Sequence, residues 1–598
     1  MTYCSGKLRL VGGCAREMRM VLAFVLGIWS AFCGGSVASA LAQGNTGTAD
    51  RADVVRGTVV NVMTREPIGR GLVLSPDNRF ATMTDDGGRF EFAIQRPEGD
   101  RADQAFGAPG AQTRTAQQPA NNRPNFLTAR KTGFLFDTNG MPGVSIGPDQ
   151  QEVTIELMPE ARIVGHVLLP GSESASGMRV DLYKRTVRDG RARWDQAGTV
   201  TARSDGEFRF AELPAGSYKV FTQESLDRDP LTSNPRGQLF GYPPVYYSAA
   251  SDFAAGAVIR LMAGETFQAS LSPLKREYYS VRLGVTNAAV QVRPDVKVWR
   301  QGHEGPGYSL GYNPRDQAIE GQLPDGSYTV QVISRGTNGL TGFSNITVSG
   351  APVSGAVMTL VPGTAIGMSV REEFRQARTG STTTITDEFR RTFTTSQRRP
   401  NYLRATLVPV EEFGFRQTYA LRSPTGPDDE SLVFENVPPG RYRVHVETGV
   451  GYVASIRSEN TDLQRLPLEV GFGASPPQIE IAVRDDGADV QGSVAGLASD
   501  GNRGEAFHSS AQTAGFVYFV PMNDSGQMKQ TWLGPDGNFR VQQLPPGTYQ
   551  VLAFDRQQPE LEFANRDVMS RYDSKARVIS VAAGQSENVQ LSLITGNQ

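Results

Sequence analysis

The fold is decided by the stretch Leu213-Pro214-Ala215-Gly216-Ser217-Tyr218-Lys219-Val220. Proline sets the backbone for a turn and glycine accepts a positive φ, so Pro-x-Gly predicts a tight reversal of the chain. The alternation Tyr-x-Val that follows predicts a strand with one face in a core. The same pattern returns three times, at 323–330, 437–444 and 544–551.

The copies of this turn are spaced one domain length apart. Their glycines are separated by 110, 114 and 107 residues, at Gly216, Gly326, Gly440 and Gly547. A degenerate copy at 97–99 adds a unit before them. Such self-similarity at a fixed period is the sequence signature of a repeat architecture. Units of roughly 100 residues can build a hydrophobic core without disulfides.

Further strand signals accompany each turn. An Asp-Gly turn precedes alternating apolar residues at 86–92, 205–210 and 536–541, so we expect this upstream strand to be the other half of a hairpin closed by the Pro-x-Gly turn. Three units open on a β-rich run with a central glycine, which predicts close approach of a neighbouring strand or a bulge. These glycines are Gly57, Gly165 and Gly492. The mature chain shows no convincing long helical period, so we predict an all-β tandem array of about five transthyretin-like or Ig-like β-sandwich domains after a signal peptide.

The expected units have boundaries that follow the repeat. They are 53–158, 159–272, 273–362, 363–484 and 485–595. Two stretches depart from the strand pattern. Residues 96–125, rich in Gln, Ala, Pro and Gly, predict a disordered loop in the first unit. Residues 371–400, rich in Arg, Thr and Glu, predict an exposed insertion in the fourth unit, with a β-hairpin as the alternative.

The first 42 residues have the pattern of a secretory signal peptide. Arginines precede an apolar run at 20–32, and an Ala-Leu-Ala sequence ending at Ala42 predicts cleavage there. The apolar run is shorter than the ~20 residues that a spanning helix needs. An uncleaved anchor and a lipoprotein modified at Cys33 remain alternatives. We therefore expect a secreted, periplasmic or outer-surface protein without a transmembrane segment in its mature chain.

Composition narrows the chemistry further. The cysteines Cys4, Cys14 and Cys33 all precede the expected cleavage point, so the mature chain has no thiol for a disulfide, a metal site or a nucleophile. The net charge of −2 over 598 residues does not indicate the concentrated basic face that nucleic-acid binding needs.

The residues of the first unit resemble a known family. Residues 57–59, 64–68, 84–90 and 128–134 are similar to the carboxypeptidase regulatory-like domain, whose family has a transthyretin-like (prealbumin-like) β-sandwich fold. In the second unit, 242–247 and 259–265 resemble a segment of secreted multi-repeat proteins of acidobacterial type. The resemblance covers units one, two and five and implies a fold more than a function. Similar folds include starch-binding-like modules and the Cna-B stalk domains of bacterial adhesins.

The sequence contains no convincing catalytic motif. The four histidines, His166, His303, His445 and His508, lack a second His or a Glu at the spacing of a zinc site. We therefore expect the catalytic carboxypeptidase domain to be absent, and we expect no catalytic residue, metal or cofactor. The segment 307–311 matches the Gly-x-Ser-x-Gly nucleophile elbow, but a proline at 314 argues against the helix that must follow. Acidic pairs such as Asp85-Asp86 are more typical of turns than of calcium sites.

Aromatic residues offer the remaining candidate site. Trp194, Trp299 and Trp532 fall in strand regions, whereas Tyr242, Tyr246 and Tyr247 lie in a proline-containing loop. Aromatic side chains serve as core or lid residues or as stacking surfaces, and we take the three tyrosines as the better candidates for glycan stacking. We expect a non-catalytic envelope scaffold or interaction protein. The alternatives are a carbohydrate-binding surface protein and the accessory chain of an exported hydrolase. Its partner would be a polysaccharide or another envelope protein.

Overall fold

The computed structural model describes most of the chain beyond the expected leader. The described residues are 53–76, 79–94, 126–135, 143–146, 150–227, 238–287, 294–334, 339–375, 382–386, 392–396, 402–410, 418–426, 429–473, 476–495, 514–522 and 528–595. The expected signal peptide, the three cysteines, the 96–125 loop and the degenerate turn at 97–99 lie outside them.

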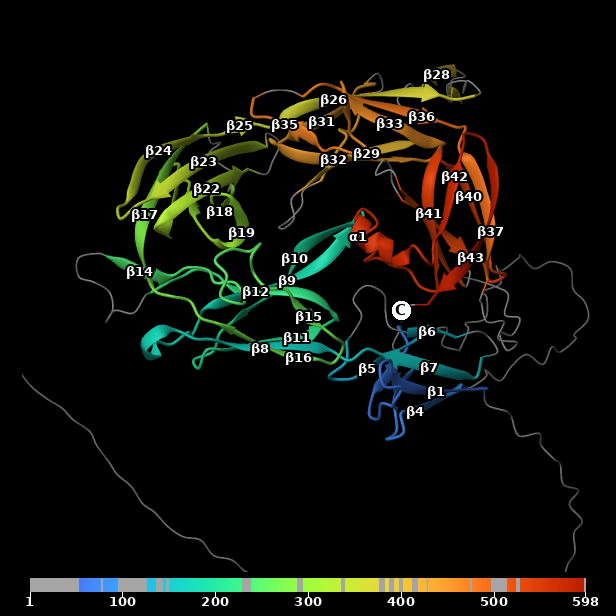
Figure 1. Ribbon diagram of the computed structural model, residues 1–598, viewed down its shortest axis with the longest axis horizontal. Coiled ribbons are helices and arrows are strands. Elements are labelled where there is room, and N and C mark those ends of the chain that lie inside the picture. Colours follow the sequence, from blue (N-terminus) through green and yellow to red (C-terminus); the bar gives the residue numbers. More distant parts are fainter. Residues whose placement is uncertain are drawn as a thin grey trace, which may run out of the picture. The chain divides into compact units, whose positions relative to one another are not determined.

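The described residues form β-sandwiches in tandem, which confirms the predicted fold class (Figure 1). Five times along the chain, the opening strand of a unit pairs antiparallel with the strand before the turn and parallel with the closing strand. A second group of strands supplies the other layer, and the strand that follows the Pro-x-Gly turn belongs to it in units two to five. Apolar residues between the layers form a separate core cluster in each unit.

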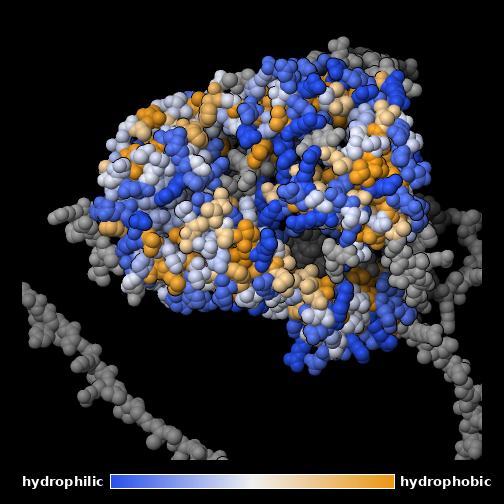
Figure 2. Space-filling model, in the orientation of Figure 1, coloured by the Kyte–Doolittle hydropathy of each residue, from blue (hydrophilic) through white to orange (hydrophobic). Residues whose placement is uncertain are grey.

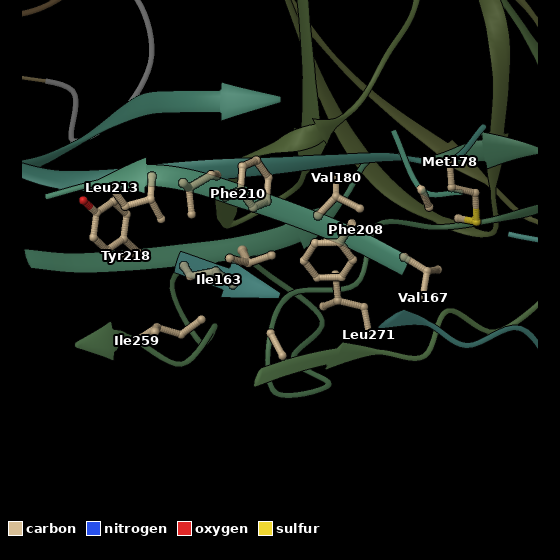
Figure 3. Packing of buried hydrophobic residues seen from close by; sticks show 14 of the residues in the cluster. Ile163, Val167, Met178, Val180, Phe208, Phe210, Leu213, Tyr218, Ile259 and Leu271 are labelled. Carbon is tan, nitrogen blue, oxygen red and sulfur yellow. The ribbon is translucent and has the colours of Figure 1, made fainter. Parts of the chain in front are cut away.

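The first two sandwiches follow this plan. In the first, the sheets are β4 (Arg89–Ile94), β1 (Asp53–Asn61), β7 (Glu152–Leu157) and β3 (Ala81–Met83), β2 (Leu72–Leu74), β5 (Phe126–Arg130), β6 (Gly143–Ser145). In the second, they are β11 (Glu207–Leu213), β8 (Ala161–Val167), β16 (Thr266–Leu271) and β10 (Arg191–Thr201), β9 (Arg179–Arg188), β12 (Gly216–Thr222), β15 (Ile259–Leu261), with a short 3-10 turn, η1 (Pro170–Ser172). Figure 3 shows Phe208, Phe210 and Val180 pointing into the space between the layers of the second sandwich.

The third sandwich takes in strands from the second unit. One sheet contains β13 (Ser225–Leu226), β14 (Leu239–Tyr242), β17 (Arg276–Thr286), β21 (Ala318–Pro324), β20 (Gly311–Asn313) and β24 (Val353–Thr359). The other contains β19 (His303–Tyr308), β18 (Asp295–Arg300), β22 (Gly326–Ile333), β23 (Leu340–Val348) and β25 (Val361–Pro362). Because β14 pairs with β17, a sheet crosses the sequence boundary expected at 272/273.

The fourth sandwich is built from two sheets and a separate hairpin. The sheets are β31 (Leu432–Val437), β26 (Thr364–Glu373), β36 (Ile479–Arg484), β33 (Tyr452–Ser458), β34 (Thr461–Asp462) and β30 (Tyr419–Ala420), β29 (Leu403–Pro409), β32 (Gly440–Thr448), β35 (Leu468–Val470). Within the expected insertion at 371–400, β27 (Thr382–Thr386) pairs antiparallel with β28 (Thr392–Ser396), which is the hairpin alternative.

In the fifth sandwich, the two layers join where β41 meets β43 in parallel. The strands run β39 (Lys529–Leu533), β38 (Gly515–Pro521), β41 (Gly547–Phe554), β43 (Ser586–Ile594), β37 (Ala488–Ala495), β40 (Asn538–Leu544), with β42 (Arg577–Val581) beside β41. Between β41 and β42 lie the single described α-helix, α1 (Arg566–Met569), and a 3-10 turn, η2 (Ser570–Tyr572).

The Pro-x-Gly turn is a corner between sheets, so the expected hairpin was wrong. Strand β11 before the turn pairs with β8, whereas β12 after it pairs with β9 in the other layer. The apolar residue before the proline (leucine in three copies, Val437 in the other) and the tyrosine after it are both buried, so the chain has to cross the end of the core. Each glycine has a φ between 154° and 159°, a conformation open almost only to glycine.

The tyrosine of each motif locks its own corner. Its buried hydroxyl donates a hydrogen bond to the carbonyl oxygen of the proline four residues earlier, at 2.6, 2.9, 2.8 and 2.7 Å in units two to five. This satisfies a polar group that would otherwise be costly to bury. The recurring residues of the motif are therefore structural. The four donors are Tyr218, Tyr328, Tyr442 and Tyr549.

The opening glycines mark close approach, as the sequence predicted. A Cβ atom on Gly165 would lie 1.8 Å from the carbonyl oxygen of Ala269 and 2.6 Å from the ring of Phe208. A Cβ atom on Gly57 or Gly492 would likewise clash with a carbonyl oxygen of the parallel neighbouring strand and with a phenylalanine ring. Any side chain here would displace the aromatic ring from the core.

Candidate functional site

Of the three tyrosines proposed for glycan stacking, two are buried and the third is partly buried. Tyr242 and Tyr246 are 4% exposed, and Tyr247 is partly buried with its ring 5.7 Å from that of Phe267. The hydroxyl of Tyr246 donates to the carbonyl oxygen of Pro306. Neither Tyr242 nor Tyr246 presents an open ring face to solvent, which corrects the expectation of a sugar platform in this loop.

Residues 243–258, here called the first covering segment, close the outer face of a sheet in the second sandwich. Their aromatic residues Tyr246 and Phe253 pack on Phe221 and Tyr183, which point away from the main core. The ring centroids of Phe221 and Tyr246 are 5.0 Å apart, and those of Tyr183 and Phe253 are 5.4 Å apart. The loop thus builds a small second core, the lid role that the sequence left open.

A buried lysine holds the first covering segment in place. Lys219 is 6% exposed, and its ammonium donates to the carbonyl oxygens of Phe253 at 2.6 Å and Ala254 at 3.1 Å. It also lies 5.1 Å from the ring centroid of Trp194 and 4.7 Å from that of Phe253. Hydrogen bonds from a charged donor and cation–π contacts offset the desolvation of the ammonium.

The fifth sandwich has an equivalent device in residues 555–576, the second covering segment. Its residues Leu561 and Met569 pack on Leu552 and Phe554 of β41. Gln550, which directly follows the motif tyrosine as Lys219 does, donates to the carbonyl oxygen of Met569 at 3.3 Å and to Asp573 at 2.9 Å. Both covering segments are therefore fastened from the same position of the motif.

A sequence signal for these covered faces was available and was missed. The third residue after the motif tyrosine points away from the main core. It is apolar and fully buried in the covered sandwiches, as Phe221 and Leu552. In the third and fourth sandwiches the same position holds Gln331 and His445, which are partly exposed. Since an apolar residue on an outer face has to be covered, this position distinguishes the two kinds of unit.

A polar cluster lies where the second unit meets the third. Glu224 accepts hydrogen bonds from the backbone nitrogen of Ser309 at 2.6 Å and from its hydroxyl at 2.8 Å. Its other oxygen, Oε2, is buried without a hydrogen-bond partner in the described residues. Burial raises the pKa of Glu224 from 4.5 to about 7, although the two bonds from Ser309 act in the opposite direction.

The nucleophile-elbow match does not have the geometry of an elbow. Strand β19 ends at Tyr308 and β20 begins at Gly311, so a strand follows the serine instead of a helix. The hydroxyl of Ser309 donates to the carboxylate of Glu224. The partner of the serine hydroxyl is therefore a carboxylate, and no histidine of the described residues lies beside it as in a serine–histidine pair.

Two of the described histidines each lie near one carboxylate, and His166 is exposed on β8. His303 Nδ1 is 3.3 Å from Asp252, and His445 Nε2 is 3.4 Å from Glu447. His508 lies outside the described residues. Across the part of the chain that the structure describes, no three His, Cys, Asp or Glu side chains come together as a metal site.

The acidic residues at the predicted turns make turn contacts. Asp85 accepts a hydrogen bond from the backbone nitrogen of Arg89 at 2.7 Å. Asp429 accepts bonds from Ser431 and Thr425, and these hold its pKa well below the ordinary value. On the face shown in Figure 2, hydrophilic and hydrophobic residues are interspersed. None of the described helices is long and apolar enough to cross a bilayer.

Comparison with known proteins gives distant structural likenesses only. No family model and no curated protein matches the sequence. Solved structures that align include the Bacillus anthracis TIE protein, with 10% identity over 71% of this chain and 69% of that chain, at a TM-score of 0.14. A streptococcal ancillary pilin aligns with 13% identity over 53% of this chain and 98% of its own, at a TM-score of 0.17. BcpA, the major pilin subunit of Bacillus cereus, aligns with 9% identity over 55% and 99%, at 0.13. Likenesses at these TM-scores carry no inference about this chain's function.

Proposed function

We propose that this chain is an exported, non-catalytic scaffold of the cell envelope, in which tandem β-sandwiches present interaction surfaces at set intervals. The proposal rests on the structural role of the repeated Pro-x-Gly-x-Tyr motif. In four units, its tyrosine hydroxyl is bonded to its own proline carbonyl, and its glycine sits in the corner between sheets. The repeated residues therefore build the corner of each sandwich.

The junction between the second and third units supports a scaffold role. Strand β14 continues the sheet of the third sandwich by pairing with β17, and Glu224 binds Ser309 across the same boundary. A connection made by sheet pairing restricts bending more than a bare linker does. We propose that the chain folds as five units, 53–158, 159–272, 273–362, 363–484 and 485–595. Strand β14 belongs to the second unit in sequence and joins a sheet of the third.

The origin of these units belongs to the same proposal. The opening glycine with its overlying phenylalanine recurs in units one, two and five, which are the units that resemble the carboxypeptidase regulatory-like domain. We infer that these three share that ancestry and that the chain has the accessory domain without its peptidase.

Cell fractionation tests the proposal. The full chain is expressed in a bacterial host that has a Sec export system, and the product is followed by immunoblotting, N-terminal sequencing and protease treatment of intact cells or spheroplasts. We expect a product that begins at Gln43, outside the cytoplasm and accessible to protease. A full-length product confined to the cytoplasm would refute export, and turnover of a peptide or ester substrate by the purified chain would refute the non-catalytic assignment.

A further inference from the structure

The fifth sandwich carries an open polar face opposite its core. In the layer of β40, β37 and β43, residues that point outward lie in rows across the three strands. The strand register sets Gln491 opposite Arg540 on one side and Asn588 on the other. Ser493 is flanked in the same way by Asn538 and Gln590. The amide side chains in both rows are exposed.

An exposed tryptophan borders this face. Trp532 on the edge strand β39 is 68% exposed. The hydroxyl of Thr531 donates to the carbonyl oxygen of Arg540 at 3.0 Å, which brings β39 against β40. Trp532, Gln491, Asn538 and Asn588 line one groove of about 640 Å³. All its lining residues belong to the fifth sandwich, so the groove is complete within one unit.

The other described tryptophans are used differently. Trp194 and Trp299 are partly buried, and each packs edge-on against a phenylalanine ring, at centroid distances of 6.0 and 6.3 Å. A single exposed apolar side chain is ordinary on a protein surface, but an aromatic ring beside a hollow that is lined by polar groups has the composition of a ligand site. Among the described tryptophans, Trp532 is the exposed one, and it lies at the groove.

We propose that this groove binds an uncharged glycan chain, with a sugar ring stacked on Trp532 and its hydroxyl groups bonded to the amide side chains of β37, β40 and β43. A pyranose ring presents an apolar face of C–H bonds and a rim of hydroxyls, each both donor and acceptor. The indole ring of Trp532 can stack on the apolar face of the sugar ring. The amides of Gln491, Asn538 and Asn588 match the rim, because each carries both a donor and an acceptor.

The charges in the groove favour an uncharged polymer. Arg540 lies 3.3 Å from Asp489 in an ion pair, and Asp536 accepts bonds from the backbone and side chain of Asn538, at 3.1 and 2.7 Å. Both charged groups thus have protein partners already. A protein ligand fits less well, since the core of a protein interface is apolar and this face offers one large apolar side chain among amides.

Retention on polysaccharides tests the inference, which does not depend on the scaffold proposal. The full mature chain is incubated with insoluble cellulose, xylan, chitin and starch granules, and with alginate gel as an acidic polymer. We expect saturable binding to at least one of the four uncharged polymers, and at least a tenfold weaker affinity for it in Trp532→Ala. Asn588→Ala should weaken the binding severalfold.

Phe472→Ala is the matched control, because Phe472 is also exposed, at 56%, and lies outside the groove. It should bind as the unaltered chain does, and thermal melting of all three variants should show that they are folded. Binding to none of the uncharged polymers, binding to alginate alone, or binding that Trp532→Ala leaves unchanged would each overturn the inference. The scaffold proposal would survive any of these results.

Discussion

The second and third sandwiches share a corner motif and differ in what covers the strand after it. In the second, β12 is followed by a long connection whose residues 243–258 fold back over its outer face. In the third, β22 turns directly into β23, its antiparallel neighbour. The chain position that separates them is the third residue after the tyrosine, Phe221 in one and Gln331 in the other. These repeats therefore keep the same core, while the side chain at this one outward-facing position differs with the covering of the outer face.

Removing the Phe221 side chain should have the largest effect. Phe221 is fully buried between the sheet and the first covering segment. Phe221→Ala should lower the free energy of opening the segment by about 3–5 kcal/mol, as for other buried phenylalanines. Hydrogen–deuterium exchange of peptides spanning 216–222 and 243–258 measures it. Gln331→Ala, the matched control, should change protection of β22 by less than about 0.5 kcal/mol; equal effects in the two variants would remove the distinction.

The junction between these two sandwiches should weaken as pH rises. The folded-state pKa of Glu224 is raised by burial to about 7, so the stabilising protonated form is fully present below its ordinary pKa of 4.5. The contribution, about 3 kcal/mol, is lost as pH rises from about 4.5 to 7. Thermal melting between pH 4.5 and 8 measures the change. Glu224→Gln keeps an acceptor for Ser309 and should flatten the profile; an unchanged slope in this variant would assign the pH dependence to other groups.

Lys219 and Gln550 hold the covering segments of the second and fifth sandwiches with hydrogen bonds of different strength. Lys219→Met keeps the length of the side chain and removes the charged donor to Phe253, which should cost about 2 kcal/mol. Gln550→Met removes a neutral donor to Met569 and should cost about 1 kcal/mol. Proteolysis within 243–258 and 555–576, compared between variants, reports the loosening of each segment. A smaller effect at Lys219 than at Gln550 would contradict the assigned roles.

The smallest effect should be common to covered and uncovered sandwiches. Each of Tyr218→Phe, Tyr328→Phe, Tyr442→Phe and Tyr549→Phe leaves a proline carbonyl without its hydrogen bond. We expect a loss of about 1 kcal/mol in every unit, because the corner is the same. Denaturant unfolding followed by hydrogen exchange resolves the units separately. A loss confined to units two and five would tie the tyrosine to the covering segments instead of the corner.

Several features of the fold could be predicted from local sequence. The Pro-x-Gly turn, the Asp-Gly turn and the strand alternation depend on residues within a few positions of each other, so each copy can be recognised alone. The glycines of the opening strands indicated close approach, and the structure shows a carbonyl and a phenylalanine ring there. The expected hairpin at Pro-x-Gly failed because turn chemistry does not determine which sheet the next strand joins.

The candidate site could not be predicted to the same depth. A proline-flanked tyrosine loop has the same sequence whether its rings face water or a sheet. Tyr246 is buried because Phe221, Tyr183 and Phe253 come together from separate parts of the chain. The exposure of Trp532 also depends on long-range pairing, since β39 is an edge strand only through the order of the sheet.

The amino-acid sequence was enough to predict a tandem array of β-sandwiches without a cysteine beyond the expected leader, because turns, alternation and repeat spacing are local or periodic properties. Three features required the folded chain: the outer faces that the covering segments close, the strand that crosses from one unit into the next, and the exposure of Trp532 beside the groove. Those outcomes depend on contacts between residues far apart in the chain, and such contacts leave no periodic mark on the sequence.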